Sequence, residues 1–238
     1  MSIFKLKQFD LKQDDNLQKM GSDTMLLGAS VKGSYSQILD VGTGTGILAL
    51  MMAQQNPNAI VYAIEPHEAS CNEAEFNFTN SQYSKRLHIE SKKLQDFKTV
   101  IKFDLIISNP PYFESSTLGN NIEKNSARHT FNLPIKDFYE GNSNLLAENG
   151  KLYLIFPYDL LQVHLNFAKE HNLFPERIIT VNKENKKPIR AIICFSFNET
   201  KNIEETSIII TLINGKYSLD YIALTKDFYG HDLSKQYS

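Results

Sequence analysis

The sequence predicts an α/β protein with a doubly wound, mostly parallel sheet of seven strands that ends in an antiparallel hairpin. Apolar runs of strand length alternate with segments of helical length, and these runs are nearly continuous, as in a sheet buried on both faces. The last strands are separated by only about five to eight polar residues, which is too short for a parallel crossover. These short connections therefore predict the hairpin at the C-terminal end.

Each expected element follows from the spacing of its apolar residues and from the turn residues beside it. An arm of alternating polarity at 3–9 precedes a helix at 22–30, which Ser22 or Asp23 is expected to cap. Strands are expected at 37–41, 59–65, 86–91, 103–108, 151–157, 176–182 and 188–198, and 206–213 is a candidate for one more. Helices are expected at 46–56, 67–81, 133–150 and 159–172, and the third of these ends at a glycine.

The 238 residues are expected to form a single domain (1–238), with an N-terminal arm and helix at 1–30 and a core with a C-terminal extension at 36–238. The net charge of −2 does not favour a broadly basic nucleic-acid-binding surface, although a local basic patch is compatible with it. The longest apolar runs are too short to cross a bilayer, and the two cysteines lack metal-binding spacing. We therefore expect a cytoplasmic monomer that holds no metal and binds no membrane.

The glycine-rich segment LDVGTGTGILAL (39–50) lies where the first core strand meets its helix. Ligands of open parallel sheets bind at the carboxyl ends of the strands, near the point where the strand order reverses. Gly42, Gly44 and Gly46 permit a sharp turn and the close approach of a ligand. The segment therefore predicts a ligand-binding turn.

The sequence of this turn is compatible with two kinds of ligand. The dinucleotide pattern G-x-G-x-x-A is met by Gly44, Gly46 and Ala49. Glu65 ends the next strand, about 20 residues further on, where an acidic residue holds a ribose hydroxyl. Asp40, just before the turn, would repel a pyrophosphate but attract a cation or an ammonium group. This favours a nucleoside without a pyrophosphate, while the turn alone leaves NAD open.

The stretch DLIISNPPYF (104–113) ends an apolar strand in a stiff corner. Pro111 pushes Pro110 into an extended conformation, and neither proline has a backbone N–H, so the Pro110 carbonyl is an oriented acceptor. The amide oxygen of Asn109 is a second acceptor, and Tyr112 offers a flat face to a planar group. Two acceptors can hold both hydrogens of an exocyclic NH₂ group and stabilise the positive charge that develops on its nitrogen. The corner therefore predicts a site that holds a planar amino group, although NPPY standing alone also fits a proline-rich strand terminator in a turn.

These motifs together resemble a known family. The order D-x-G-x-G-x-G at 40–46 resembles motif I of the class I S-adenosylmethionine-dependent methyltransferases, and NPPY at 109–112 resembles the amino-methyltransferases. With MGSDTMLLGAS (20–30), NSARHT (125–130) and the tail YSLDYIALTKDFY (217–229), nearly the whole chain resembles the bacterial tRNA1(Val) adenine-N6 methyltransferase family.

The resemblance implies a Rossmann-like class I methyltransferase fold, S-adenosyl-L-methionine as cofactor, and N6-methylation of the adenosine 3′ of the anticodon, adenine 37 of tRNA1(Val). It implies catalytic roles for Asn109, Pro110, Pro111 and Tyr112. It implies cofactor binding by Asp40, Gly42, Thr43, Gly44, Gly46, Glu65, Pro66, Leu94 and Asn109.

One position departs from the family pattern. A short Asp-hydrophobic step after the third strand usually contacts the adenine of the cofactor in such enzymes, whereas Lys93 stands where the Asp would fall. Leu94 is still expected to pack on the adenine and to offer its backbone N–H. Asp96 falls too far along the chain, so the side-chain contact to the adenine amino group is not accounted for.

Other functions fit parts of this sequence. A glutamine-N5 methyltransferase that acts on release factors would use the same corner, because a glutamine amide presents the same two hydrogens. Such enzymes resemble a catalytic domain preceded by a long helical domain, and only residues 1–41 precede Gly42 here. A DNA adenine methyltransferase would normally carry a target-recognition domain, which the sequence does not show. A non-catalytic nucleotide-binding module is a further alternative, against which the intact corner argues.

Basic residues near the predicted site are candidates for RNA contacts. Arg128 and His129 follow the corner, and Lys186, Lys187 and Arg190 lie in the segment KENKKPIR (183–190). Phosphate contacts would make the affinity steeply dependent on salt, and the target base would turn outward onto the corner. Each cluster also fits a solvated surface, and His129 fits a structural role equally well.

Overall fold

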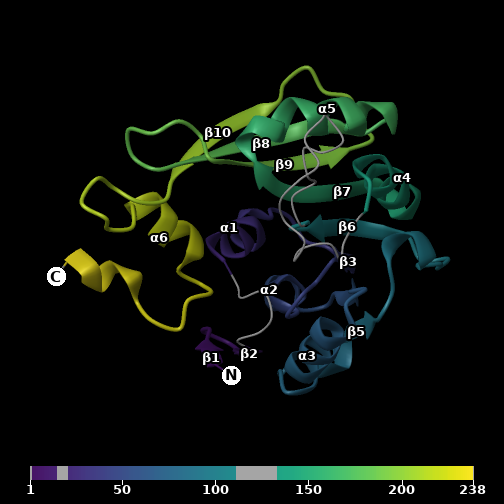
Figure 1. Cartoon of the computed structure of the whole chain (residues 1–238), viewed down its shortest axis with the longest axis horizontal. Coiled ribbons are helices and arrows are strands. Elements are labelled where there is room, and N and C mark those ends of the chain that lie inside the picture. The colour runs from purple at the N-terminus through teal and green to yellow at the C-terminus, as the bar shows by residue number, and fades with distance from the viewer. Residues whose placement is uncertain (1, 15–20, 111–132, 238) are drawn as a thin grey trace, which may run out of the picture.

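The computed structural model describes residues 2–14, 21–110 and 133–237 (Figure 1). Its centre is an eight-stranded sheet in the order β10-β8-β9-β7-β6-β3-β4-β5. These strands are β3 (Gln37–Val41), β4 (Ile60–Ile64), β5 (Leu87–Glu90), β6 (Phe103–Ser108), β7 (Leu146–Pro157), β8 (Phe174–Asn182), β9 (Arg190–Ser196) and β10 (Glu204–Ile209). The N-terminal β1 (Ser2–Lys5) and β2 (Asp10–Gln13) form a separate antiparallel pair.

Helices cover both faces of the large sheet (Figure 1). One face packs against α1 (Ser22–Ser30), α2 (Ile47–Gln55), α3 (Glu68–Thr79) and α6 (Leu219–Thr225), and the other against α4 (Ile135–Leu145) and α5 (Leu161–Glu170). Successive strand residues point to opposite faces, so Ile38 joins the first hydrophobic core and Leu39 the second. This arrangement confirms the predicted doubly wound sheet and explains why its central strands are nearly continuous apolar runs.

The strand order reverses between β3 and β6. β3 pairs in parallel with β4 on one side and with β6 on the other, and Asp40 lies opposite Ile107 in the second pair. The carboxyl ends of β3 and β6 therefore meet at the same edge of the sheet, which is where open α/β sheets bind ligands.

The C-terminal half of the sheet contains the predicted antiparallel hairpin. β9 pairs antiparallel with both β7 and β8, and Arg190 lies opposite Val181 at the start of the hairpin. The expected total of seven strands is wrong, because the candidate strand at 206–213 is present as β10 (Glu204–Ile209), an eighth strand parallel to β8. β9 already has a partner strand on each side, so β10 pairs with the free edge of β8.

The helix predicted for 133–150 ends at Leu145, and residues 146–150 already belong to β7. Gly150, which looked like a helix terminator, lies in the strand where its pairing with β6 is irregular. A Cβ atom at Gly150 would lie 2.8 Å from the carbonyl oxygen of Phe103. The glycine is thus explained by a close approach of two strands, which helical periodicity cannot reveal.

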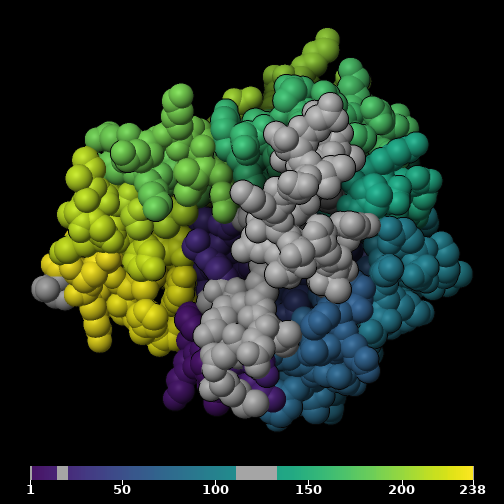
Figure 2. All heavy atoms as spheres, viewed as in Figure 1, coloured from purple at the N-terminus to yellow at the C-terminus, as the bar shows by residue number. Residues whose placement is uncertain are grey.

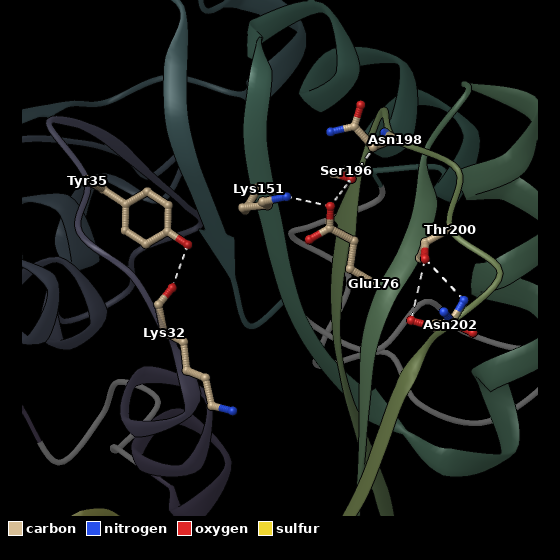
Figure 3. Close-up of polar contacts among 8 residues, drawn as sticks. All are labelled: Lys32, Tyr35, Lys151, Glu176, Ser196, Asn198, Thr200 and Asn202. Carbon is tan, nitrogen blue, oxygen red and sulfur yellow. Dashed lines mark hydrogen bonds and ion pairs between the residues drawn. The ribbon is translucent and has the colours of Figure 1, made fainter.

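The edge of the sheet opposite the carboxyl ends of β3 and β6 is held together by polar groups. Glu176 on β8 accepts hydrogen bonds from Lys151 on β7 (2.5 Å) and from Ser196 on β9 (2.6 Å) (Figure 3).

Within the described ranges, no helix is long and apolar enough to cross a membrane.

Candidate active site

The glycine turn between β3 and α2 uses three left-handed residues, with φ of 71° at Gly42, 57° at Gly44 and 86° at Gly46. A Cβ atom at Gly46 would lie 2.5 Å from Phe78 Cε1 on α3, so this glycine permits close helix packing. A Cβ atom at Gly42 or Gly44 would meet nothing within 4 Å. These two glycines therefore border open space that a ligand can enter.

Asp40 is fully buried beneath this turn. Its Oδ2 accepts hydrogen bonds from the Thr43 hydroxyl (2.5 Å) and the Ala49 backbone N–H (3.0 Å). Its buried Oδ1 has no hydrogen-bond partner within the described part of the chain. Burial raises the pKa of Asp40 to about 7, although the two hydrogen bonds oppose this shift. Asp40 therefore braces the turn, and its contact with a cationic group stays a prediction.

Glu65 follows β4 and joins the turn from the other side. Its Oε2 accepts from the Gly44 N–H (2.9 Å) and its Oε1 from the His67 N–H (3.0 Å). The side chain is buried, which raises its pKa, while the two backbone hydrogen bonds favour the charged form. Pro66 beside it is half-buried. Each carboxylate oxygen keeps a lone pair for the predicted ribose contact.

The corner after β6 is fixed to the turn by hydrogen bonds. Ser108 donates its hydroxyl hydrogen to the Val41 carbonyl (2.7 Å), which ties the ends of β6 and β3. The next residue, Asn109, donates from Nδ2 to the hydroxyl oxygen of Thr24 on α1 (3.0 Å). This contact uses the nitrogen end of the amide, and the role of Oδ1 as an acceptor for a substrate stays a prediction. Pro110 is buried, whereas Pro111 and Tyr112 lie outside the described residues.

Leu94 and Lys93 lie at the start of the short helix η2 (Leu94–Asp96). Leu94 is only 5% exposed, and it packs so closely on α4 that a Cβ atom at Gly141 would lie 2.8 Å from its Cγ. Lys93 is exposed. The contact of Leu94 with a cofactor adenine stays a prediction.

The candidate RNA-binding residues fall into three groups. Lys186 and Lys187 are exposed in the β8–β9 loop, which lies at the same edge of the sheet as Asn109 because β9 runs antiparallel to β7. Arg190 forms an ion pair with Asp23 on α1 (2.7 Å). Arg128 and His129 lie outside the described residues.

Sequence reasoning missed two side chains that build this site. Thr24 was visible only as part of a family motif, with no sign that it contacts Asn109. Asn77 on α3 donates to the Thr45 carbonyl in the glycine turn (2.8 Å) and to the Lys12 carbonyl on β2 (3.0 Å). The expected capping of α1 by Ser22 or Asp23 is wrong, since Gly21 is the N-cap.

In the part of the chain that the structure describes, no three potential metal ligands of the His, Cys, Asp or Glu types cluster together.

The chain is similar to methyltransferases by sequence and by fold. Residues 18–164 match the family model Methyltransferase small domain. A predicted O-methyltransferase from Agrobacterium tumefaciens has the same fold, with a TM-score of 0.69, 15% identity, and coverage of 88% of this chain and 98% of that one. A ribosomal protein L11 methylase from Lactobacillus delbrueckii gives a TM-score of 0.52 at 19% identity over 74% of this chain and 78% of its own. Fold and site thus define an S-adenosylmethionine-dependent methyltransferase.

The finer assignment comes from close relatives. A tRNA1(Val) (adenine(37)-N6)-methyltransferase from Christiangramia forsetii is 35% identical over 95% of this chain and 97% of its own length. The Bacteroides fragilis enzyme of the same name has the same identity and the same coverage of both chains. The chain belongs to the tRNA1(Val) (adenine(37)-N6)-methyltransferase family, which confirms the resemblance seen in its motifs.

The glycines of the turn are expected to respond differently to alanine. Both Gly44→Ala and Gly46→Ala introduce left-handed strain of about 1–2 kcal/mol. Gly46→Ala adds an overlap with Phe78, so urea unfolding should show a further loss of about 1–3 kcal/mol. Gly44→Ala should instead weaken S-adenosylmethionine binding in calorimetry. Equal destabilisation by both changes, with normal cofactor binding, would contradict this division of roles.

Asp40→Asn should alter the pH dependence of stability. Because burial raises the pKa of Asp40 from 3.8 to about 7, the folded protein holds this proton more tightly than the unfolded chain. The resulting stabilisation is complete below the unfolded pKa and is lost as the pH rises to 7, at up to about 1.4 kcal/mol per pH unit. The unfolding free energy of Asp40→Asn relative to wild type should therefore increase between pH 5 and pH 7. A constant difference would refute the raised pKa.

Proposed function

We propose that this protein transfers a methyl group from S-adenosylmethionine to N6 of adenine 37 in tRNA1(Val), the reaction named for its relatives. The observation that carries the proposal is the placement of Asn109. Its amide lies at the end of β6, next to the glycine turn of β3, with Nδ2 engaged by Thr24 and Oδ1 left as an acceptor.

The described residues fit the cofactor. The open space at Gly42 and Gly44 admits a ligand against the backbone, and the buried Asp40 Oδ1 lacks a hydrogen-bond donor. Asp40 would attract the ammonium group of the methionine part, while Glu65 would accept from the ribose hydroxyls. Thr43, Gly46, Pro66 and Leu94 would complete the site. When bound, S-adenosylmethionine supplies an electrophilic methyl group on a positively charged sulfur.

The corner would activate the adenine amino group by holding its hydrogens. Asn109 Oδ1 and the Pro110 carbonyl would each accept one hydrogen, which draws electron density toward the nitrogen and stabilises its developing positive charge. Attack on a methyl group of a sulfonium needs no strong base beforehand, so the proton can leave afterwards to an acceptor of the corner or to water. Pro111 would stiffen the corner and Tyr112 would stack on the base.

The β8–β9 loop is the RNA-binding surface that we propose. A surface hollow of about 400 Å³ lies between this loop and residues 211–213, and it is bordered by Lys183 and Lys186. Glu184 donates its backbone N–H to the Thr211 carbonyl (2.9 Å), which holds the two segments together. In Figure 2 the green spheres of this region lie beside the purple spheres of α1. Arg128 and His129 remain further candidates, and the protein would act as a monomer.

Asn109→Ala is expected to abolish methyl transfer while cofactor binding persists. Loss of a preorganised group that stabilises transition-state charge costs about 10²–10³-fold in rate. Single-turnover transfer from labelled S-adenosylmethionine measures the rate, and calorimetry measures the cofactor affinity. If both quantities fell by the same factor, the catalytic assignment of Asn109 would be wrong.

The double change Lys186→Glu/Lys187→Glu should weaken tRNA binding and flatten its salt dependence. Each lost phosphate contact lowers the slope of log affinity against log salt by about 0.7–0.9. A matched control is Lys169→Glu/Lys201→Glu, which reverses two exposed lysines near the opposite edge of the sheet. Equal slopes for the two double variants would remove the β8–β9 loop from the interface.

The substrate class is tested by offering three pools to the wild-type protein with labelled S-adenosylmethionine: total tRNA, release factor, and DNA. Digestion and mass spectrometry then identify the methylated group. The proposal predicts N6-methyladenosine in the tRNA pool. Label on a release-factor glutamine, or on DNA adenine alone, would overturn it.

A further inference from the structure

The side chain of Thr24 joins the first turn of α1 to the corner after β6. Its hydroxyl oxygen accepts a hydrogen bond from Asn109 Nδ2 at 3.0 Å, although the two residues are 85 positions apart. Thr24 is only 8% exposed, so water has little access to replace this contact. In this pairing the Nδ2 end of the Asn109 amide faces Thr24 on α1.

The orientation of this amide decides whether it can act on an amine. An asparagine side chain presents an acceptor oxygen at one end and two N–H donors at the other. If the amide were turned by 180°, its N–H groups would face the N–H groups of the substrate and repel them. The hydroxyl of Thr24 engages the nitrogen end and leaves the oxygen for the substrate.

The turn of α1 that carries Thr24 is itself anchored. Asp23 Oδ2 accepts a hydrogen bond from Arg190 Nε at 2.7 Å, and Arg190 also donates to the Ile189 carbonyl (2.9 Å). The side chains of this ion pair are only 19% and 26% exposed, so they are held at the start of β9 rather than extended into solvent. Further along α1, Gly28 allows close contact with Met51 of α2.

We propose that Thr24 is a positioning residue for methyl transfer, which holds the Asn109 amide with its oxygen toward the reacting amine, and that the Asp23–Arg190 ion pair holds Thr24 in place. This inference rests on the proposed role of Asn109 and names the residues that orient its side chain. It also gives Arg190 a different role from the phosphate contact predicted from the sequence, and the two roles have different experimental signatures.

The direct test compares Thr24→Val, which keeps the shape but removes the hydroxyl, with Thr24→Ser, which keeps the hydroxyl. Thr24→Val should lower kcat by about tenfold to a hundredfold, because a misplaced reacting group is costly, with KM values for tRNA and cofactor nearly unchanged. Thr24→Ser should recover most of kcat. Ser22→Ala, which removes an exposed hydroxyl from the same turn, is the control and should behave as wild type.

Several results would overturn the positioning role. These are an unchanged kcat in Thr24→Val, an equal loss in Thr24→Ser, or a loss that appears only in KM or in thermal stability. Failure of the proposed function is distinguishable, because the wild-type protein would then methylate no tRNA at all. Transfer to tRNA by wild type and Thr24→Val at the same rate would refute only the role of Thr24.

The role of Arg190 is separated from RNA binding by a paired measurement on Arg190→Gln and Asp23→Asn. If the ion pair anchors α1, both changes should lower kcat several-fold and leave the salt slope of tRNA binding unchanged. If Arg190 instead contacts a phosphate, Arg190→Gln alone should lower that slope by about 0.7–0.9, and Asp23→Asn should not weaken binding. The second pattern would refute the anchor. If Arg190→Gln unfolds, Asp23→Asn still separates the two roles, because it removes the ion pair and keeps the charge of Arg190.

Discussion

The parallel pairing of β3 with β6 is the constraint on which the site depends. It brings the ends of two strands that are far apart in sequence to one edge, and the hydrogen bond from Ser108 to the Val41 carbonyl locks them there. The glycine turn and Asn109 therefore have a fixed relation before any ligand binds. Preorganisation of this kind matters for methyl transfer, because small displacements of a reacting group are costly in rate.

Two buried carboxylates stabilise the glycine turn, and we propose that the same two groups bind the cofactor. Asp40 ties β3 to α2 through Thr43 and Ala49, and Glu65 holds the N–H of Gly44. A buried carboxylate that is not paired with a cation costs stability, and the raised pKa of each group reflects this cost. A cationic ligand beside Asp40 would offset part of this stability cost. The free energy of binding such a ligand therefore includes the stabilisation of the Asp40 carboxylate.

Local signals made most of this site predictable. The strands 37–41 and 103–108 and the glycine turn are set by adjacent residues, so their apolar runs and glycines reveal them. Contacts between distant segments leave no such signal. The basic residues of 183–190 suggested one cluster, yet Arg190 pairs with Asp23 on α1. Likewise, the parallel addition of β10 depends on which sheet edge is free, and Gly150 is explained only by its approach to β6.

We propose that the Asn109 corner acts on the amino group of one adenine of a tRNA. Mass spectrometry can locate the methyl group in tRNA1(Val) transcripts that carry either adenosine or guanosine at nucleotide 37. One N6-methyladenosine is expected at nucleotide 37 of the first transcript, with no incorporation into the second. Equal methylation of both transcripts, or methylation of a different atom, would contradict it.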